Sequence, residues 1–247
     1  MSNNGGASNK NDSQIKRHRR LPLELQCEVF CALPFHYGGR MLLLCRPIAS
    51  NCVALVRKQK QKFEEFKNRW NPSACEDGLT IIKPKRLVVQ NNGKIWRRRS
   101  VFAERPLPKK NSGIFYYEVK LLAKESIVRI GLSTKKMPLM DVLVGVYKGF
   151  YAYGSWGTFM GHEVKGCSLF NGYPYIDGKP KFEEGDVIGC GVDLATRQII
   201  YTKNGRRLET TGLFVADSVA KLFPCISLYC FGTNIEANFG PHFEFKF

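Results

Sequence analysis

The chain has 247 residues, a formal net charge of +17 and a hydrophobic content of 44%. This length suits one large β domain with a smaller piece, or two modest domains, and the composition allows a packed core. No run of about 18 apolar residues occurs, which argues against a membrane-spanning helix. Aromatic residues make up 12% of the chain and favour sheet over helix.

Residues 1–20 are polar and end in the basic cluster Lys16–Arg20. We expect a disordered arm here, because little apolar surface is available for burial. The cluster is compatible with a nuclear import signal, a phosphate contact or a solvated arm. The N-terminus lacks the apolar stretch of a signal peptide, and the nine scattered cysteines fit reduced thiols. We therefore expect a cytoplasmic and/or nuclear protein.

The positive charge is concentrated in the first part of the chain. Residues 1–110 hold 23 Lys and Arg against 8 Asp and Glu, whereas residues 111–247 hold 15 against 13. The stretch "KIWRRRS", Lys94–Ser100, combines an aromatic residue with three arginines, so nucleic-acid binding is an alternative to protein binding. In a strand, however, Arg97 and Arg99 would point outward and protect a sheet edge. No RNP-type motif or recognition helix is evident.

Residues 21–70 are predicted to be helical. Pro22 suits a first helical turn, and apolar residues follow at near-helical spacing until Pro34. A later helix is predicted to be basic and amphipathic, with an apolar stripe formed by Val53, Val56, Phe63, Phe66 and Trp70. The four cysteines of this segment (Cys27, Cys31, Cys45 and Cys52) fit small core residues better than a zinc site, because the spacing resembles no known finger.

From about residue 79 the pattern changes to short strands. The stretches "LTII", "RLVVQ", "SVFAE", "GIFYYEVKLLA" and "SIVRIGLST" are β-branched and aromatic and are bounded by turn residues. Within residues 114–121, Phe115, Tyr117, Val119 and Leu121 form the apolar face. No helical pattern separates the strands, so we predict an antiparallel sandwich.

The stretch "EEGDVIGCGVDLATRQIIYTKNGRRL" predicts a pair of strands and a hairpin. Asn204-Gly205 is the strongest short hairpin signal, because both residues tolerate a positive φ. Gly189 and Gly191 permit a close approach to the strand or a bulge. Asp193 begins a turn between the two strands.

No catalytic constellation is evident, and we expect neither an enzyme, a cofactor nor a metal site. The GxSxG and HExxH motifs are absent, and the proximity of His162 and Cys167 in one loop is weak support for a nucleophile pair. Glu183-Glu184 precedes a turn and fits a solvated loop better than paired acid–base groups.

Residues 112–247 resemble the SPRY domain family. The similarity rests on "GIFYYEVKLL", "VRIGLST", the GDVIGC-x-x-D and TKNG motifs, "LFPCISLY" and "ANFGPHFEF" in this order. The resemblance implies a curved two-sheet antiparallel β-sandwich without a catalytic centre, which binds a target protein or peptide through loops at one edge. Residues 79–111 fit the strands that extend such a domain, so we place it at 79–247.

The resemblance also implies partner-binding residues: Arg105, Pro106, Leu107, Tyr147, Lys148, Trp156, Phe231 and Gly232. Arg105-Pro106 is similar to an Arg-Pro pair that grips an extended acidic peptide in one branch of the family. Phe231-Gly232 stands where that branch has Trp-Gly, and Leu107 replaces a polar residue. Packing in a core or loop is the alternative for Trp156. Tyr151 and Tyr153 are expected in the same aromatic loop.

The stretch "LPLELQCEVFCAL…LLLCRPIASNCVALV" resembles an F-box, a three-helix module. The resemblance implies a contact with a Skp-type adaptor of a cullin-type ubiquitin ligase, made by Leu21, Pro22, Leu25, Val29 and Phe30. The alternative is that these residues pack in a core, since an apolar helix face is buried by default.

The stretch "GSWGTFMGHEVKGCSLFNGYPY" is similar to SPRY effectors of plant-parasitic nematodes, and we expect a non-secreted relative. Three functions stay open: a non-enzymatic substrate adaptor of a ubiquitin ligase, a plain SPRY binding module of effector-like ancestry, and a basic nucleic-acid-binding protein.

Overall fold

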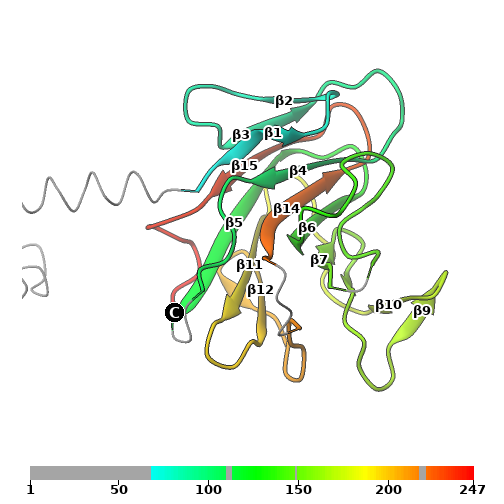
Figure 1. Ribbon diagram of the computed structural model, residues 1–247, viewed down its shortest axis with the longest axis vertical. Helices are drawn as coiled ribbons and strands as arrows, with labels where there is room; N and C mark the ends of the chain where they lie inside the picture. Colours follow the sequence, from blue (N-terminus) through cyan, green and yellow to red (C-terminus); the bar gives the residue numbers. More distant parts are fainter. Residues whose placement is uncertain (1–67, 110–112, 148, 217–220) are drawn as a thin grey trace, which may run out of the picture. The chain divides into compact units, whose positions relative to one another are not determined.

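The computed structural model describes residues 68–109, 113–147, 149–216 and 221–247. They belong to one compact unit, Lys67–Phe247, and contain fifteen strands in two antiparallel sheets (Figure 1). The predicted basic arm, the F-box-like contact residues and the four cysteines of the helical segment lie outside the described residues. No helix of the described residues is long and apolar enough to span a membrane.

The two sheets contain eight and seven strands. The eight-stranded sheet has the order β1 (Trp70–Cys75), β4 (Arg99–Ala103), β14 (Phe223–Leu228), β6 (Val128–Ser133), β7 (Tyr151–Gly154), β8 (Thr158–Met160), β10 (Tyr173–Ile176) and β9 (Ser168–Phe170). The seven-stranded sheet has the order β13 (Arg206–Arg207), β12 (Ile199–Lys203), β11 (Val187–Asp193), β5 (Ile114–Ala123), β15 (Asn234–Asn238), β3 (Val88–Asn91) and β2 (Leu79–Ile81).

The sandwich begins at Trp70, nine residues before the predicted start of the domain. The prediction that Trp70 belongs to a helical stripe is wrong: it is the first residue of β1 and is fully buried. Its indole N–H donates to the carbonyl of Leu87 at 2.9 Å, and its ring packs edge-on against Phe239. These contacts join segments far apart in the chain, so a local spacing rule does not detect them.

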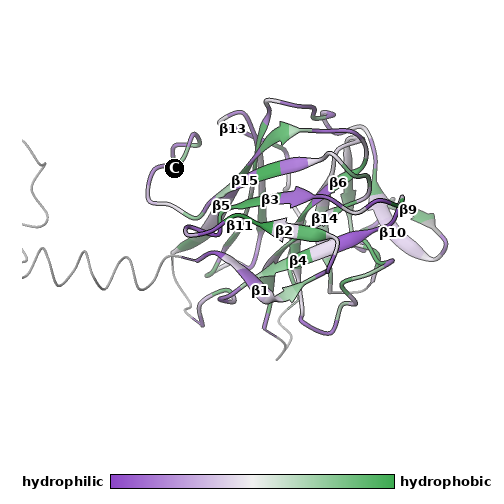
Figure 2. Ribbon diagram, turned by 90° about the horizontal axis from the view of Figure 1, so that it is seen from above, coloured by the Kyte–Doolittle hydropathy of each residue, from purple (hydrophilic) through white to green (hydrophobic). Residues whose placement is uncertain are grey.

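Alternation along β5 places the predicted apolar face in the core. Tyr117, Val119 and Leu121 are fully buried between the sheets, and Phe115 packs against them. The hydroxyl of Tyr117 donates to the carbonyl of Gly131 in the opposite sheet at 2.7 Å, which satisfies a buried polar group. In Figure 2 β5 is largely hydrophobic, whereas the edge strand β1 is largely hydrophilic. The predicted antiparallel sandwich is confirmed.

The other face of β5 is also covered. Tyr116 and Glu118 are buried, although their alternation with the core residues suggests exposure. The segment after β15 lies over them: the rings of Phe243, Phe245 and Phe247 all contact Tyr116, at centroid distances of 4.9–5.8 Å. The C-terminal segment therefore adds a second apolar layer outside the seven-stranded sheet.

The predicted hairpin at Asn204-Gly205 is confirmed, and its φ angles are 48° and 69°. Asn204 also fixes the neighbouring turn, because its side-chain NH₂ donates to Asp186 at 2.7 Å and its side-chain oxygen accepts the N–H of Val187 at 2.8 Å. Lys203 pairs with Asp186 at 2.9 Å. This stretch is therefore scaffold rather than a site.

A second apolar cluster lies on the outer face of the eight-stranded sheet, where the long β6–β7 loop folds back over the strands. The Leu139 carbonyl accepts the N–H of Ser100 at 2.8 Å, and the N–H of Val144 donates to the hydroxyl of Ser227 at 2.8 Å. The buried members of this cluster are Phe102, Met137, Val144, Phe150, Ala152, Met160, Phe223 and Cys225. The prediction of an aromatic loop at Tyr151 and Tyr153 is wrong, because both lie in β7 and are buried.

Arg99 does not protect a sheet edge. Strand β4 lies between β1 and β14, and the Arg99 side chain is buried, with its Nε 2.9 Å from the Glu76 carboxylate. A β-carbon at Gly78 or Gly93 would lie 2.1 or 2.2 Å from this side chain. Two glycines therefore make room for a buried ion pair that the sequence pattern does not reveal.

Candidate functional site

Several loops meet at the end of the eight-stranded sheet where β4 and β6 begin and β14 and β7 end. The register sets this arrangement, because Leu228 pairs with both Arg99 and Val128, and Arg129 pairs with Gly154. The β3–β4, β7–β8 and β14–β15 connections therefore leave the sheet at the same end. The β6–β7 loop reaches this end as well, since Met140 forms a bridge with Arg99.

These loops expose large apolar side chains, which we call the aromatic edge: Ile95, Trp96, Met140, Trp156 and Phe231. Their exposed fractions run from 44% for Met140 to 67% for Trp96. Trp156 is 64% exposed, which excludes the alternative of core packing for this residue. Exposed apolar groups gathered at one place on a domain mark an interaction site more often than scattered ones do.

The backbone of the aromatic edge is held by hydrogen bonds. The Ser155 N–H donates to the Val128 carbonyl at 2.9 Å, and the Ser155 hydroxyl accepts the Val128 N–H at 3.2 Å, which fixes the turn that carries Trp156. The Gly232 N–H donates to the Asn91 carbonyl at 2.9 Å, next to Phe231. The edge is thus a preorganised surface rather than a set of free loops.

Basic side chains flank the aromatic edge. Arg97 pairs with the exposed Asp141 at 3.2 Å, and Arg98 donates to the backbone carbonyl of Asp141 at 3.3 Å. Arg129 of β6 donates to the carbonyl of Val144 at 3.3 Å. Burial, followed by the positive charge of Arg98, lowers the pKa of Arg129 to about 10. The stretch that suggested nucleic-acid binding thus contributes Ile95, Trp96 and three arginines to this region.

The structure does not bring the predicted site residues together. Arg105 follows the end of β4, whereas Phe231 follows the end of the antiparallel neighbour β14, so they lie at opposite ends of the sheet. The Arg105 backbone is held by the side chain of Asn68, with bonds of 3.0 Å in both directions. Leu107 is buried in the core and its N–H donates to the Leu222 carbonyl, so its side chain offers no surface, while Pro106 is half-buried.

Tyr147 lies apart from both Arg105 and Phe231. Its ring packs edge-on against Phe150 and against Tyr173 of β10, at centroid distances of 5.6 and 5.4 Å. Strand β10 is five positions from β4 in the sheet order, which separates Tyr147 from Arg105. Lys148 lies outside the described residues. Of the predicted partner-binding residues, Trp156, Phe231 and Gly232 are those that share one end of the sheet.

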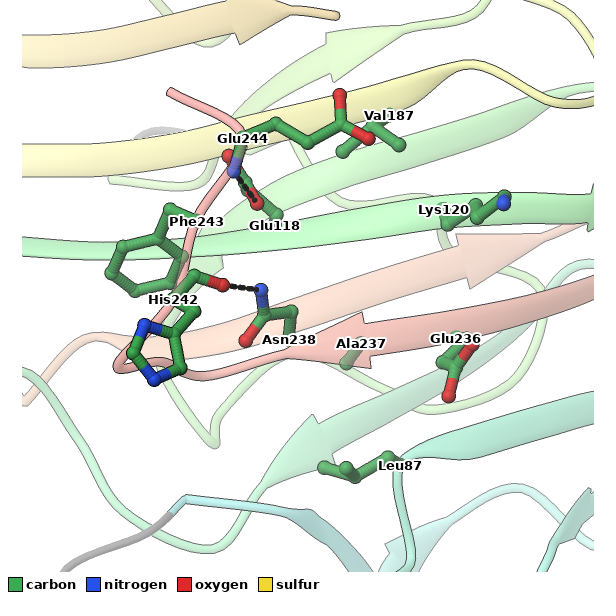
Figure 3. A pocket seen from close by; sticks show the side chains of 10 residues that line it. All are labelled: Leu87, Glu118, Lys120, Val187, Glu236, Ala237, Asn238, His242, Phe243 and Glu244. Atoms are coloured by element: carbon green, nitrogen blue, oxygen red, sulfur yellow. Dashed lines mark hydrogen bonds between the residues drawn. The ribbon is translucent and has the colours of Figure 1, made fainter. Parts of the chain in front are cut away.

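A cavity of about 470 Å³ lies on the outer face of the seven-stranded sheet (Figure 3). Its lining is mixed in charge and polarity: Leu87, Glu118, Lys120, Val187, Glu236, Ala237, Asn238, His242, Phe243 and Glu244. Glu118 accepts N–H groups from Glu244 and Phe245 at 2.9 and 3.0 Å and the hydroxyl of Tyr116 at 3.0 Å. These bonds anchor the C-terminal segment, so the Glu118 carboxylate has a structural role here.

His162 and Cys167 do not form a catalytic pair in the structure. His162 is buried, its Nε2 lies 3.3 Å from the Tyr201 hydroxyl, and its ring packs against Tyr151. Burial lowers the pKa of His162 to about 4, so its side chain is neutral near pH 7. This histidine belongs to the aromatic core.

The fold is an antiparallel two-sheet β-sandwich of the kind found in SPRY domains. The sequence profile of the SPRY domain matches residues 114–242, just over half of the chain, and the chain belongs to the SPRY domain family. Ran-binding protein 9 from Danio rerio is 39% identical over 145 residues, which are 58% of this chain and 22% of that protein. The Ran-binding proteins 9/10 homolog of Drosophila melanogaster is 35% identical over 60% of this chain and 14% of its own length.

The chain thus spans about a fifth or less of the curated relatives named here. Among solved structures, the SPRY domain of human HERC1 aligns with 68% of this chain and 96% of its own, with a TM-score of 0.51. At 17% sequence identity this similarity shows the fold alone.

Proposed function

We propose that the chain is a non-enzymatic protein-interaction module whose aromatic edge binds a target protein or peptide. The observation that carries this proposal is the exposure of Ile95, Trp96, Met140, Trp156 and Phe231 from loops that leave one end of one sheet. Tryptophan and arginine are enriched in binding hot spots. The aromatic edge contains two tryptophans, and arginines flank it.

The test compares full-length variants in affinity capture with quantitative mass spectrometry. Trp96→Ala and Phe231→Ala should each lose the same captured proteins, and the purified partner should then bind more weakly by about 2 kcal/mol, the usual hot-spot effect. Leu169→Ala is the matched control, because Leu169 is equally exposed but lies on β9 at the far side of the sheet. Capture that is unchanged in both edge variants would contradict the proposal. Ran is the first purified candidate, since the relatives carry its name.

A more specific function is that of a substrate adaptor, and the F-box-like segment at residues 21–70 is the sequence feature that favours it. Leu21, Pro22, Leu25, Val29 and Phe30 would contact a Skp-type adaptor, and the SPRY domain would present its target to a cullin-type ubiquitin ligase. Recovery of a Skp-type adaptor with the intact chain, and its loss in the double variant Leu25→Asp and Val29→Asp, is the expected result. Equal recovery with the double variant would remove the ligase role.

The second form of the proposal is a plain SPRY binding module of effector-like ancestry, supported by the stretch "GSWGTFMGHEVKGCSLFNGYPY". It predicts that deletion of residues 1–70 changes the stability of the domain but abolishes binding to no partner.

For location we propose the cytoplasm and/or nucleus, supported by the basic cluster Lys16–Arg20. A fluorescent fusion with these residues changed to alanine should lose nuclear signal, and an unchanged distribution would remove the import role of the cluster.

A further inference from the structure

Two arginines beside the aromatic edge have no carboxylate partner within ion-pair distance among the residues that the structure describes. Arg98 and Arg129 donate to carbonyls three residues apart in the same loop, those of Asp141 and Val144. The nearby carboxylate of Asp141 is already paired with Arg97. The two guanidinium groups therefore share a small region in which positive charge exceeds negative charge.

The excess of positive charge is unusual because one of the two arginines, Arg129, is partly buried. Arg129 is half-buried, and it lies in one register row with Ser100, Ser227 and Gly154 on the outer face of the sheet. The hydroxyls of Ser100 and Ser227 bond each other and the β6–β7 loop, so they provide no negative charge. A partly buried guanidinium normally has an anionic partner, because desolvation of an unpaired charge is costly.

A threonine lies beside Arg129 on the other side of its register neighbour. This neighbour is Gly154, and a β-carbon there would lie 2.8 Å from the Thr158 hydroxyl and 3.8 Å from Cγ of Arg129, so the Thr158 side chain already fills the space over Gly154 and lies next to the Arg129 stem. The positive charge of Arg98 acts on Arg129, so an anion that approaches this region would meet two guanidinium groups. Guanidinium groups bind phosphate and carboxylate oxygens in a bidentate manner.

We propose that Arg98 and Arg129 bind a phosphomonoester on the protein partner, so that the aromatic edge recognises its target in a phosphorylated form. This inference rests on the proposed function and adds the chemistry of the partner to it. Two unpaired positive charges match the charge of about −2 on a phosphoserine or phosphothreonine better than the single charge of a carboxylate. The exposed Trp156, in the turn that follows Gly154, would contact the residues that flank the phosphate.

A small probe tests the site without any knowledge of the partner. The full-length chain is titrated with phenyl phosphate, and with benzoate as the matched carboxylate, while NMR follows the arginine Nε–H and tryptophan indole signals. Phenyl phosphate should bind in a saturable manner and at least about tenfold more tightly than benzoate, because the dianion gains from both guanidinium groups. Equal binding of the two probes, or no saturable binding, would overturn the proposal.

Substitutions of the two arginines test whether phenyl phosphate binds at this site. Arg129→Met and Arg98→Met keep an apolar stem and remove the charge, and each should weaken phenyl phosphate binding by about tenfold or more. Arg98 is exposed, so Arg98→Met remains informative even if Arg129→Met fails to fold. The control is Arg206→Met, since Arg206 is exposed on β13 of the other sheet. Unchanged binding in Arg98→Met and Arg129→Met would place the phosphate elsewhere and contradict the proposal.

A peptide-binding experiment distinguishes the phosphate site from the protein-interaction function on which it rests. A phosphoserine and phosphothreonine peptide library should be enriched over its unphosphorylated counterpart, and the Arg98→Met variant should lose the enrichment. One alternative outcome is that peptides bind equally well with and without phosphate, with an affinity that depends on Trp96 and Phe231. That result would support the protein-interaction function and contradict the phosphate site. If single-stranded RNA binds with a steep salt dependence that Arg98→Met and Arg129→Met both reduce, the phosphates come from nucleic acid and the proposal is wrong.

Discussion

Gly189 and Tyr116 are in direct contact across adjacent strands: a β-carbon at Gly189 would lie 1.9 Å from the Tyr116 hydroxyl. The Tyr116 side chain crosses the face of β11 at this point, and its hydroxyl bonds the side chains of Thr202 and Glu118. The glycine in "GCG" is therefore required by a tyrosine 73 positions earlier in the chain. The sequence pattern predicted a close approach at Gly189 but not the group that approaches.

Gly189→Ala should destabilise the domain by about 1–3 kcal/mol, the usual cost of overpacking a filled interior. The measurement is urea unfolding of the full-length chain. In the double variant Gly189→Ala and Tyr116→Phe, the loss should be smaller than the sum of the single losses, because removal of the hydroxyl relieves part of the overlap. Additive losses would show that Tyr116 is not the group that excludes a side chain from position 189.

Removal of residues 243–247 should destabilise the domain and expose Tyr116. The three phenylalanines that cover Tyr116 would be lost, together with two N–H groups that bond the buried Glu118. A buried carboxylate without its donors is costly, on the order of 1–3 kcal/mol or more. Urea unfolding measures the loss, and hydrogen exchange in the intact chain should show protection of the Glu244 and Phe245 amides. Rapid exchange of both amides would contradict the anchoring role of Glu118.

The buried pair of Arg99 and Glu76 should matter far more for stability than the exposed pair of Arg97 and Asp141. Arg99→Met leaves Glu76 without its cation and should cost about 3–5 kcal/mol in the free energy of unfolding. Arg97→Met is the matched control, and its cost should stay within about 1 kcal/mol, because both groups of its pair are exposed. Similar losses in the two variants, measured by chemical denaturation, would show that burial does not distinguish the pairs.

The free energy of unfolding should decrease in acid, in part because the Asp186 carboxylate becomes protonated. Burial by itself would raise the pKa of this carboxyl, but hydrogen bonds from Asn204 and the Glu183 N–H, together with the Lys203 ammonium, hold the pKa below its ordinary value. A lowered pKa in the folded state stabilises the protein above the unfolded pKa of about 4, and this contribution disappears as the pH falls through the folded pKa.

Asp186→Asn should therefore flatten the dependence of the unfolding free energy on pH below about pH 4, relative to the unchanged chain. Asp177→Asn serves as the control, because Asp177 is exposed and lies outside this turn. A pH profile that is the same in Asp186→Asn and in the unchanged chain would remove the stabilising role of Asp186.

Features that depend on a few neighbouring residues could be predicted from the sequence. The alternation of Phe115, Tyr117, Val119 and Leu121 identified the core face of β5, because side chains in a strand point to opposite faces with a period of two. The Asn204-Gly205 pair identified a hairpin, because a positive φ is a local property of these residue types. The order of the motifs in residues 112–247 indicated the SPRY domain family.

Which distant segments of the chain meet could not be predicted from the sequence and is visible in the folded structure. Strand pairing separates Arg105 from Phe231 and brings Trp96, Trp156 and Phe231 to one end of the sheet, and no local pattern contains that register. The burial of Arg99 likewise depends on β1 pairing outside β4, and the burial of Tyr116 depends on the C-terminal segment. The physical reason is that hydrogen-bonded pairing and side-chain packing join residues far apart in the chain, whereas spacing and turn chemistry act over a few residues.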